Sequence, residues 1–282
     1  MLDEAQSLCV LGCGTMGEAI VAGLLRAGWL APDKVIVTAR RSSVAEKLRA
    51  KLGVAATTDN LAACQAAEVV VVCLKPQRYA DVLDHASMRA ALAGKLVISI
   101  AAGVTLEKLS GWLPDTALIR AMPNTPSLIG EGMTVVCRMP APSGADEPAS
   151  ANRASDDQLA LAQRIFESVG ACLELEPKLM DVVTSLNGSG PAFVYVMLEA
   201  MADGGVMMGL PRDVALTIAA QVFRGAAAMV LDTDMHPAAL KDQVTTPAGC
   251  TIAGILTMED GRIRSVLART IQEAAKVASG LG

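Results

Sequence analysis

Three glycines near the start of the chain have the spacing GxGxxG, which can hold a dinucleotide. Gly12, Gly14 and Gly17 lie where a predicted strand, Leu8–Gly12, passes into a predicted helix, Met16–Ala27. In such a junction the first glycine permits a tight turn, the second lets a pyrophosphate approach the backbone, and the third lets helix and strand pack closely. The start of the helix adds free N–H groups and the positive end of its dipole. The motif therefore predicts a dinucleotide site, with a turn that serves packing alone as the alternative.

The residues after the second predicted strand, Lys34–Ala39, indicate which dinucleotide binds. A site for NAD carries an acidic residue about 20 residues further on, which bonds the ribose 2′-hydroxyl. Here Arg40, Arg41 and Ser42 take that place, and the first carboxylate is Glu46. Two guanidinium groups, hydroxyls and a helix start favour a 2′-phosphate instead. The segment therefore predicts NADP, although two solvated loop arginines would give the same pattern.

Two further predicted strands, Val69–Leu74 and Leu96–Ala101, end in residues suited to a nearby ligand. Ligands of parallel α/β sheets bind beyond the carboxyl ends of the strands. Lys75 and Pro76 follow the first strand, and small residues follow the second. We expect both strand ends to contact the cofactor, whereas for Lys75 a solvated lysine at a helix start is the alternative.

Near the other end of the chain, a Thr-Thr-Pro-Ala-Gly turn at residues 245–249 separates two helical patterns. Hydroxyls and free backbone amides at the start of a helix can hold a carboxylate. An ordinary helix cap has the same composition. The turn by itself therefore does not distinguish binding from capping.

These candidate sites need elements that position them. Short β-branched runs alternate with helical stretches up to Glu176-Pro177, beyond which only Ala- and Met-rich helical patterns follow. The pattern predicts an α/β fold, with a doubly wound, Rossmann-type parallel sheet in a dinucleotide-binding domain at 1–176 and an all-α domain for substrate binding and dimerisation at 177–282. Pro140–Ser155 reads as an exposed loop. The remaining predicted strands and helices are Ala117–Met122, Met133–Cys137, Ala171–Leu175, Ser43–Leu52, Gln77–Ala93 and Asp156–Val169.

Two predicted helices of the second domain are apolar around most of their circumference. Pro191–Met208 carries only the charges Glu199 and Asp203, and the polar residues of Asp213–Leu231 form one narrow stripe. A helix of this kind is buried on most sides. We expect two copies of the chain to share these helices in a homodimer, with a compact core inside one chain as the alternative.

The composition argues against several classes of protein. With 52% hydrophobic and 19% charged residues the chain is not disordered, and with a net charge of −5 and no basic run we expect no nucleic-acid partner. No uninterrupted apolar run approaches the roughly 18–20 residues of a membrane span, and Met1–Glu4 lacks signal-peptide features, so we expect no membrane. Seven scattered cysteines predict a reducing cytoplasm, and two histidines argue against a metal site.

Six stretches of the chain, taken in order, match the pattern of one known family. They are Arg120–Pro126, Gly130–Met133, Gly188–Tyr195, Glu199–Gly204, Met208–Pro211 and Leu240–Gly254. With them the chain resembles the pyrroline-5-carboxylate reductases, which reduce Δ1-pyrroline-5-carboxylate to proline with NAD(P)H, and Leu240–Gly254 is similar to that family's signature. The resemblance covers nearly the whole chain, with Asn187 and Cys250 as departures from residues usual in that family.

The resemblance implies NADPH as cofactor, with NADH as a further one, and a homodimer that assembles into a decameric ring. Because Thr251 follows Gly249 in the carboxylate turn, we expect its hydroxyl to lie beside the imine nitrogen, and capping of the next helix is the alternative role for this residue. The substrate contacts that the resemblance implies are Asp234, Thr246, Gly249, Cys250 and Thr251. The cofactor contacts it implies are Leu11, Gly12, Cys13, Gly14, Thr15, Met16, Gly17, Thr38, Arg40, Arg41, Ser42, Asn60, Cys73, Leu74, Lys75, Pro76, Ile100, Ala101 and Ala102.

Two other functions are compatible with the glycine turn. A β-hydroxyacid dehydrogenase shares the two-domain plan, but that family supplies a lysine base after a Gly-Ser-Gly stretch, and Ser189–Leu198 contains no lysine or histidine. A non-catalytic NADP-binding protein would not need the carboxylate turn. A protonated cyclic imine accepts hydride without a dedicated acid, so positioning alone, which contributes about 7–11 kcal/mol, suits the residues present.

Overall fold

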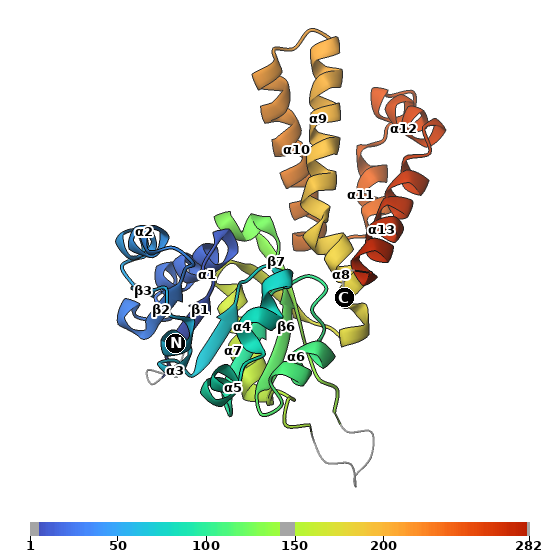
Figure 1. The fold of residues 1–282 in the computed structure, drawn as a ribbon. Coiled ribbons are helices and arrows are strands. Elements are labelled where there is room, and N and C mark those ends of the chain that lie inside the picture. The colour runs from blue at the N-terminus through green and yellow to red at the C-terminus, as the bar shows by residue number, and fades with distance from the viewer. Residues whose placement is uncertain (1–5, 142–149, 281–282) are drawn as a thin grey trace. The chain divides into compact units, whose positions relative to one another are not determined.

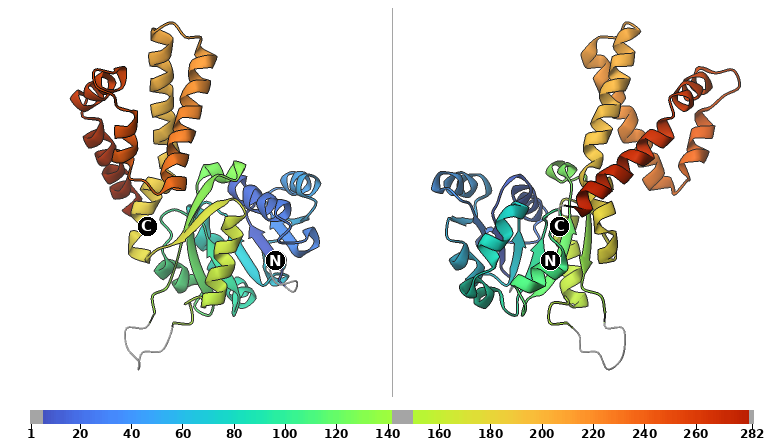
Figure 2. Two further views of the ribbon diagram at one scale, coloured as in Figure 1. Left: turned by 180° about the vertical axis from the view of Figure 1, so that it is seen from behind. Right: turned by 45° about the vertical axis from the view of Figure 1, so that its right-hand side comes forward.

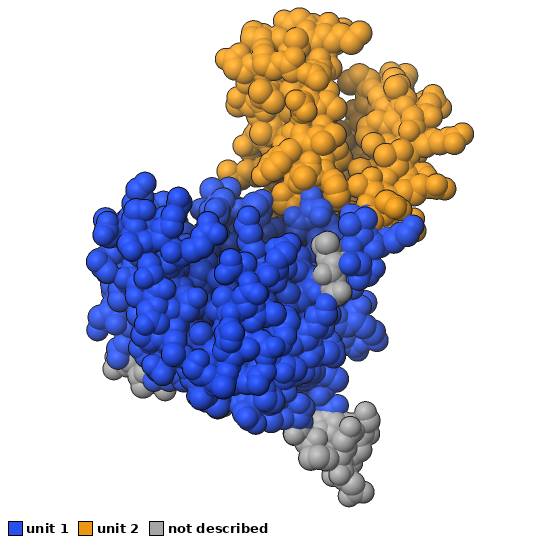
Figure 3. Space-filling view, viewed as in Figure 1, with its two compact units in different colours: residues 1–189, 274–282 blue, residues 190–273 orange. Residues whose placement is uncertain are grey.

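The structure, a computed structural model, describes residues 6–141 and 150–280. The expectations for Met1–Glu4 and for residues 142–149 of the predicted loop lie outside these described residues. The chain divides into two compact units, one of residues 1–189 with 274–282 and one of residues 190–273 (Figure 3). Every strand of the described chain lies in the first unit, and the second is helical.

Among the described residues, the first unit contains an eight-stranded sheet in the order β3-β2-β1-β4-β5-β6-β7-β8 (Figure 1). β1 to β6 are parallel, as predicted, whereas β7 is antiparallel to β6 and parallel to β8. All four residues of β1, β4 and β5 are buried, which explains their unbroken apolar runs. The strands are β1 (Leu8–Leu11), β2 (Val35–Thr38), β3 (Ala55–Thr57), β4 (Val69–Val72), β5 (Leu96–Ser99), β6 (Ala117–Met122), β7 (Gly132–Arg138) and β8 (Gly170–Glu174).

Helices cover both faces of this sheet (Figure 2). Residues alternate along β1, so Leu8 and Val10 join one core with α1, α2 and α7, while Cys9 and Leu11 join the other with α3 to α6. This arrangement is the predicted doubly wound plan. The helices of this unit are α1 (Thr15–Arg26), α2 (Ser42–Leu52), α3 (Asn60–Gln65), α4 (Tyr79–Leu83), α5 (Ala86–Leu92), α6 (Leu106–Trp112), α7 (Asp156–Glu167) and α8 (Met180–Val183).

Several elements differ from the sequence-based expectation, among them the short helices α3 and α6, which were not predicted. β3 was not predicted, because it is only three residues long and lies at the edge of the sheet. The single helix expected at Gln77–Ala93 is instead a 3₁₀ turn at Pro76–Arg78 followed by α4 and α5. The break falls at Asp84, whose backbone leaves the helical region with ψ of 53°.

The second unit is built around two long helices that pack on each other, α9 (Gly190–Met207) and α10 (Arg212–Thr233). The residues buried along them are small, namely Ala202, Ala215 and Ala219. Most of their large apolar side chains are exposed on this single chain. The shorter helices that follow are α11 (Pro237–Val244), α12 (Cys250–Asp260) and α13 (Ile263–Ser279), the last of which is divided between the two units.

By length and composition, α10 is one helix of the described chain that could cross a membrane. The expectation from uninterrupted apolar runs did not foresee this, because Thr217 and Gln221 interrupt the run without adding charge. One such helix does not by itself indicate a membrane protein, since the apolar helices of soluble assemblies meet the same criterion.

Candidate functional site

The glycine turn lies between the carboxyl end of β1 and the start of α1. Gly12 has φ of +79°, and a Cβ there would lie 2.4 Å from Leu74 Cδ2, so only glycine fits. Thr38 at the end of β2 holds the turn: its Oγ1 accepts a hydrogen bond from Gly12 N at 2.9 Å, and its carbonyl accepts one from Cys13 N at 2.7 Å. Thr38 therefore braces the turn from the neighbouring strand.

The other two glycines leave room for a phosphate and for packing. A Cβ on Gly17 would lie 2.8 Å from Val10 Cγ1, so this glycine lets α1 approach β1. A Cβ on Gly14 would meet no atom within 4 Å, and Gly14 caps α1 without any side-chain hydrogen bond. The first N–H groups of α1 therefore have no side-chain cap, and there is room beside Gly14, as a pyrophosphate cradle requires.

The predicted 2′-phosphate segment is exposed at the end of β2. Arg40, Arg41 and Ser42 are exposed, and Arg41 occupies the cap position of α2 with no side-chain cap bond. The first turn of α2 contains no acidic residue. Two cations and the free end of a helix are groups that can hold a phosphate.

The strand order places the predicted cofactor residues along one edge of the sheet. The chain runs from β1 outward to β2 and β3, then returns to β4 on the other side of β1, so β1 and β4 form the switch point where such sheets bind dinucleotides. Cys73 N donates to Leu11 O at 2.8 Å, and Ile100 N donates to Val72 O at 3.3 Å. The segments brought to this edge are Leu11–Gly17, Thr38, Arg40–Ser42, Asn60, Cys73–Pro76 and Ile100–Ala102.

Sequence reasoning missed two buried residues at this edge, Tyr79 on α4 and Ser99 at the end of β5. The Tyr79 hydroxyl donates to Val72 O at 2.7 Å, and the Ser99 hydroxyl donates to Tyr79 Oη at 3.1 Å. Burial raises the pKa of Tyr79 well above its usual value, so its hydroxyl stays protonated at physiological pH. A rare tyrosine in an amphipathic stretch is the one sign of this pair in the sequence.

The predicted substrate turn lies in the second unit and leads directly into α12. Gly249 caps α12 without a side-chain bond, so the first N–H groups of this helix are free. A Cβ on Gly249 would lie 2.4 Å from Thr246 Oγ1, and Ala248 has φ of 57°, so the turn is tight. Cys250 is exposed and Thr251 half-buried in the first turn of α12.

Two details of this turn bear on the expectations. Because Gly249 is the cap residue and no side chain caps α12, the alternative that Thr251 caps this helix is wrong. Asp234 ends α10 in a left-handed conformation with φ of 53°. The eight residues of α11, about 12 Å of helix, stand between Asp234 and the turn along the chain.

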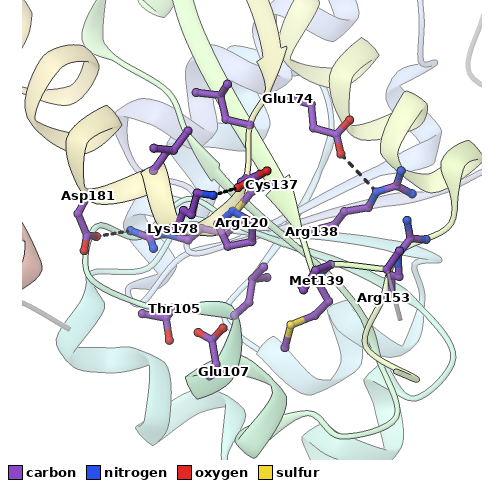
Figure 4. Close-up of a pocket in the computed structure, with 17 residues that line it drawn as sticks. Thr105, Glu107, Arg120, Cys137, Arg138, Met139, Arg153, Glu174, Lys178 and Asp181 are labelled. Atoms are coloured by element: carbon purple, nitrogen blue, oxygen red, sulfur yellow. Dashed lines mark hydrogen bonds and ion pairs between the residues drawn. The ribbon is translucent and has the colours of Figure 1, made fainter. Parts of the chain in front are cut away.

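A separate cavity of about 1050 Å³ lies in the first unit and involves none of the predicted site residues (Figure 4). It is lined by residues of β6, β7, β8 and α6, and two of its arginines form ion pairs, with Arg120 3.4 Å from Asp181 and Arg138 3.3 Å from Glu174. Within the described chain, the Nε atoms of Arg120 and Arg153 lack a hydrogen-bond partner, but both are shielded from solvent. None of the cofactor or substrate residues predicted from the sequence lines this cavity, and we assign it no ligand.

No group of three or more His, Cys, Asp or Glu side chains in the described ranges is placed to hold a metal ion.

Comparisons with known proteins agree on one family. A family model described as pyrroline-5-carboxylate reductase dimerisation matches residues 177–281, and another described as NADP oxidoreductase, coenzyme F420-dependent, matches residues 7–103. The pyrroline-5-carboxylate reductase of Schizosaccharomyces pombe is 40% identical over 290 residues, and the match covers 97% of this chain and 98% of that enzyme. That of Synechocystis sp. is 40% identical over 279 residues, covering 98% of each chain.

Solved structures extend the likeness to three dimensions. A pyrroline-5-carboxylate reductase from Coxiella burnetii matches with a TM-score of 0.88 and 30% identity over 98% of each chain. The pyrroline carboxylate reductase of Plasmodium falciparum, solved with NADP bound, matches with a TM-score of 0.84 and 26% identity over 99% of each chain. With relatives at this identity over almost its whole length, the chain belongs to the pyrroline-5-carboxylate reductase family.

Proposed function

We propose that this protein reduces Δ1-pyrroline-5-carboxylate to proline with NADPH. The observation that carries the proposal is that the chain has two helix N-termini without a side-chain cap, each in a different setting. One, behind Gly14, opens at the switch point of the sheet, and the other, behind Gly249, opens in a Thr-Thr-Pro-Ala-Gly turn. A dinucleotide and a small carboxylate are the ligands that such termini bind.

The cofactor residues have distinct roles in this proposal. The N–H groups behind Gly14 bind the pyrophosphate, and Arg40 and Arg41 face the 2′-phosphate and so favour NADPH over NADH. When bound, NADPH supplies the hydride. The ends of β4 and β5 then support the nicotinamide half, because the adenosine half is held on the other side of the switch point, at β2.

The substrate residues act through binding and orientation. The free amides of α12 and the Thr246 hydroxyl hold the carboxylate, and the Thr251 hydroxyl lies beside the ring nitrogen. Asp234, Gly249 and Cys250 complete the substrate contacts that the family resemblance implies. The protonated imine is already electrophilic, so the protein needs to supply position rather than a strong acid.

The assembly in this proposal is a cytoplasmic homodimer formed through α9 and α10, with five such dimers in a decameric ring. The exposed apolar side chains of these helices support the dimer. Sedimentation velocity of the purified chain distinguishes monomer, dimer and decamer.

The activity is tested by following the loss of NADPH absorbance with pyrroline-5-carboxylate and by identifying proline as the product. If the protein turns over a 3-hydroxyacid with NADP but does not turn over the imine, the result would instead support a β-hydroxyacid dehydrogenase. Tight binding of NADPH without turnover of either compound would support a non-catalytic NADP-binding protein.

A further inference from the structure

The hydroxyl of Tyr79 lies between the ends of two strands that flank the predicted nicotinamide position. Tyr79 is fully buried, although it is the first residue of a five-residue helix. Its hydroxyl is 2.7 Å from the carbonyl of Val72, the last residue of β4, and 3.1 Å from the Oγ of Ser99, the last residue of β5. One buried side chain thus joins both strand ends.

The hydrogen bonds at this hydroxyl have only one consistent direction. Val72 O can only accept, so the Tyr79 hydroxyl donates to it, and the Ser99 hydroxyl must then donate to Tyr79 Oη. Ser99 Oγ in turn accepts from Ala101 N at 3.4 Å. The result is a relay from Ala101 through Ser99 and Tyr79 to Val72, in which each bond polarises the next.

The relay ends at the segments expected to contact the cofactor. Ala101 lies within Ile100–Ala102, and Val72 directly precedes Cys73–Pro76. Val72 O also accepts from Ile100 N at 3.3 Å, so the tyrosine adds a second hydrogen bond to this carbonyl at the end of β4. The glycine turn and the Arg40–Ser42 segment take no part in the relay, because they lie at the ends of β1 and β2.

We propose that Tyr79, acting with Ser99, is a positioning residue. It fixes the spacing of the β4 and β5 ends and so shapes the binding site for the nicotinamide half of NADPH. This inference rests on the proposed function. It assigns the adenosine half of the cofactor to residues that do not depend on Tyr79. The two halves of the dinucleotide therefore respond differently to loss of the tyrosine hydroxyl.

The test compares Tyr79→Phe with the unmodified protein by calorimetric titration of NADPH and of adenosine 2′,5′-bisphosphate, which lacks the nicotinamide half. Loss of the hydroxyl removes two hydrogen bonds, so we expect the Kd for NADPH to rise about 3- to 10-fold. The Kd for the bisphosphate is expected to stay the same. Ser99→Ala is expected to act in the same direction, and the double variant to be no worse than Tyr79→Phe, because both changes break one relay.

Thr116→Val is the matched control. Its buried hydroxyl also donates to a carbonyl, that of Leu92 at 3.2 Å, but Thr116 precedes β6 at the opposite edge of the sheet. This variant is expected to lower the melting temperature without changing the affinity for either ligand.

Three results would contradict the inference. Unchanged NADPH affinity in Tyr79→Phe would show that the relay does not position the cofactor, and an equal loss for both ligands would show that the tyrosine only stabilises the fold. If Tyr79→Phe does not fold, Ser99→Ala decides by the same two criteria. Failure of the unmodified protein to bind NADPH at all would overturn the proposed function together with this inference.

Discussion

Gly12 and Gly14 are two residues apart, yet their surroundings differ completely. Gly12 has a positive φ and lies against Leu74, so its missing side chain is a requirement of the fold. Gly14 has φ of −100°, which any residue adopts, and open space where a Cβ would be. The fold does not require glycine at position 14, so we attribute it to a ligand that must approach the backbone there.

Gly14→Ala is therefore expected to spare the fold and impair the cofactor site. The free energy of unfolding should change by less than about 1 kcal/mol, while the Kd for NADPH rises roughly tenfold or more because the methyl group occupies the pyrophosphate cradle. Gly12→Ala is the contrasting control, and its positive φ alone costs about 1–2 kcal/mol of stability. Chemical unfolding and NADPH titration measure both effects. Unimpaired NADPH binding by Gly14→Ala would place the pyrophosphate elsewhere.

Thr251 offers a second test at this scale. Because it does not cap α12, removal of its hydroxyl should leave stability almost unchanged. If the hydroxyl contacts the substrate nitrogen in the transition state, Thr251→Val lowers kcat and kcat/KM together. The loss is about 10- to 100-fold for one hydrogen bond to a charged group. Thr257→Val, which removes an exposed hydroxyl bonded to Ala253 O on the same helix, should leave turnover normal.

A higher KM with an unchanged kcat in Thr251→Val would instead assign this threonine to ground-state binding of the carboxylate. It would remove the residue from the chemistry of the imine.

At the level of elements, the sequence predicted those strands whose position is determined by their own run of apolar residues. β1, β4 and β5 have unbroken apolar runs because each is buried on both faces, and their positions were predicted to within two residues. β3 could not be predicted, since its three residues are held by pairing with β2 rather than by their own pattern. The Tyr79–Ser99 contact was equally hidden, because it joins residues twenty positions apart that only the tertiary fold brings together.

Asn187 shows how a single departure from the family pattern can join elements. It lies in a π-helical turn, Thr184–Gly188, just before the boundary between the two units. Its side-chain amide donates to Met122 O at 2.7 Å and to Met133 O at 3.0 Å, and its carbonyl accepts from Asn124 at 2.9 Å. The turn is thereby tied to the end of β6 and the start of β7.

Asn187→Ser, which restores the residue usual in the family, is expected to destabilise this protein. Serine is too short to reach all three partners, and the unpaired groups left behind cost about 1–3 kcal/mol. Asn187→Asp should be worse, because a carboxylate would face two carbonyl oxygens in place of the amide donor. Urea unfolding of the three proteins gives the order. Equal stability of the serine variant would mean that water replaces the asparagine amide in full.

At the scale of the whole molecule, the second unit leaves apolar surface that one chain does not cover. Large side chains on α10 remain about half exposed, with Ile218 at 49% and Val222 at 50%, and Met207 at the end of α9 reaches 87%. Soluble proteins rarely leave such contiguous apolar surface in water. The match of this region to the dimerisation model of the family supports our proposal that a second copy of the chain covers this surface. The same explanation accounts for the membrane-like composition of α10.

Ile218→Glu with Val222→Glu should therefore weaken the homo-oligomer. Each change would bury a carboxylate in an apolar interface, and the cost of desolvating an unpaired charge favours the separated chains. Sedimentation velocity at micromolar concentration is expected to show a smaller species than the unmodified protein, with a lower melting temperature. Gln221→Glu on the neighbouring polar stripe is the control, because a charge that remains in water carries no such penalty. If the double variant sediments like the unmodified protein, this face of α10 lies outside the interface. The apolar helix would then need another covering surface, and flotation with lipid vesicles would test whether that surface is a membrane.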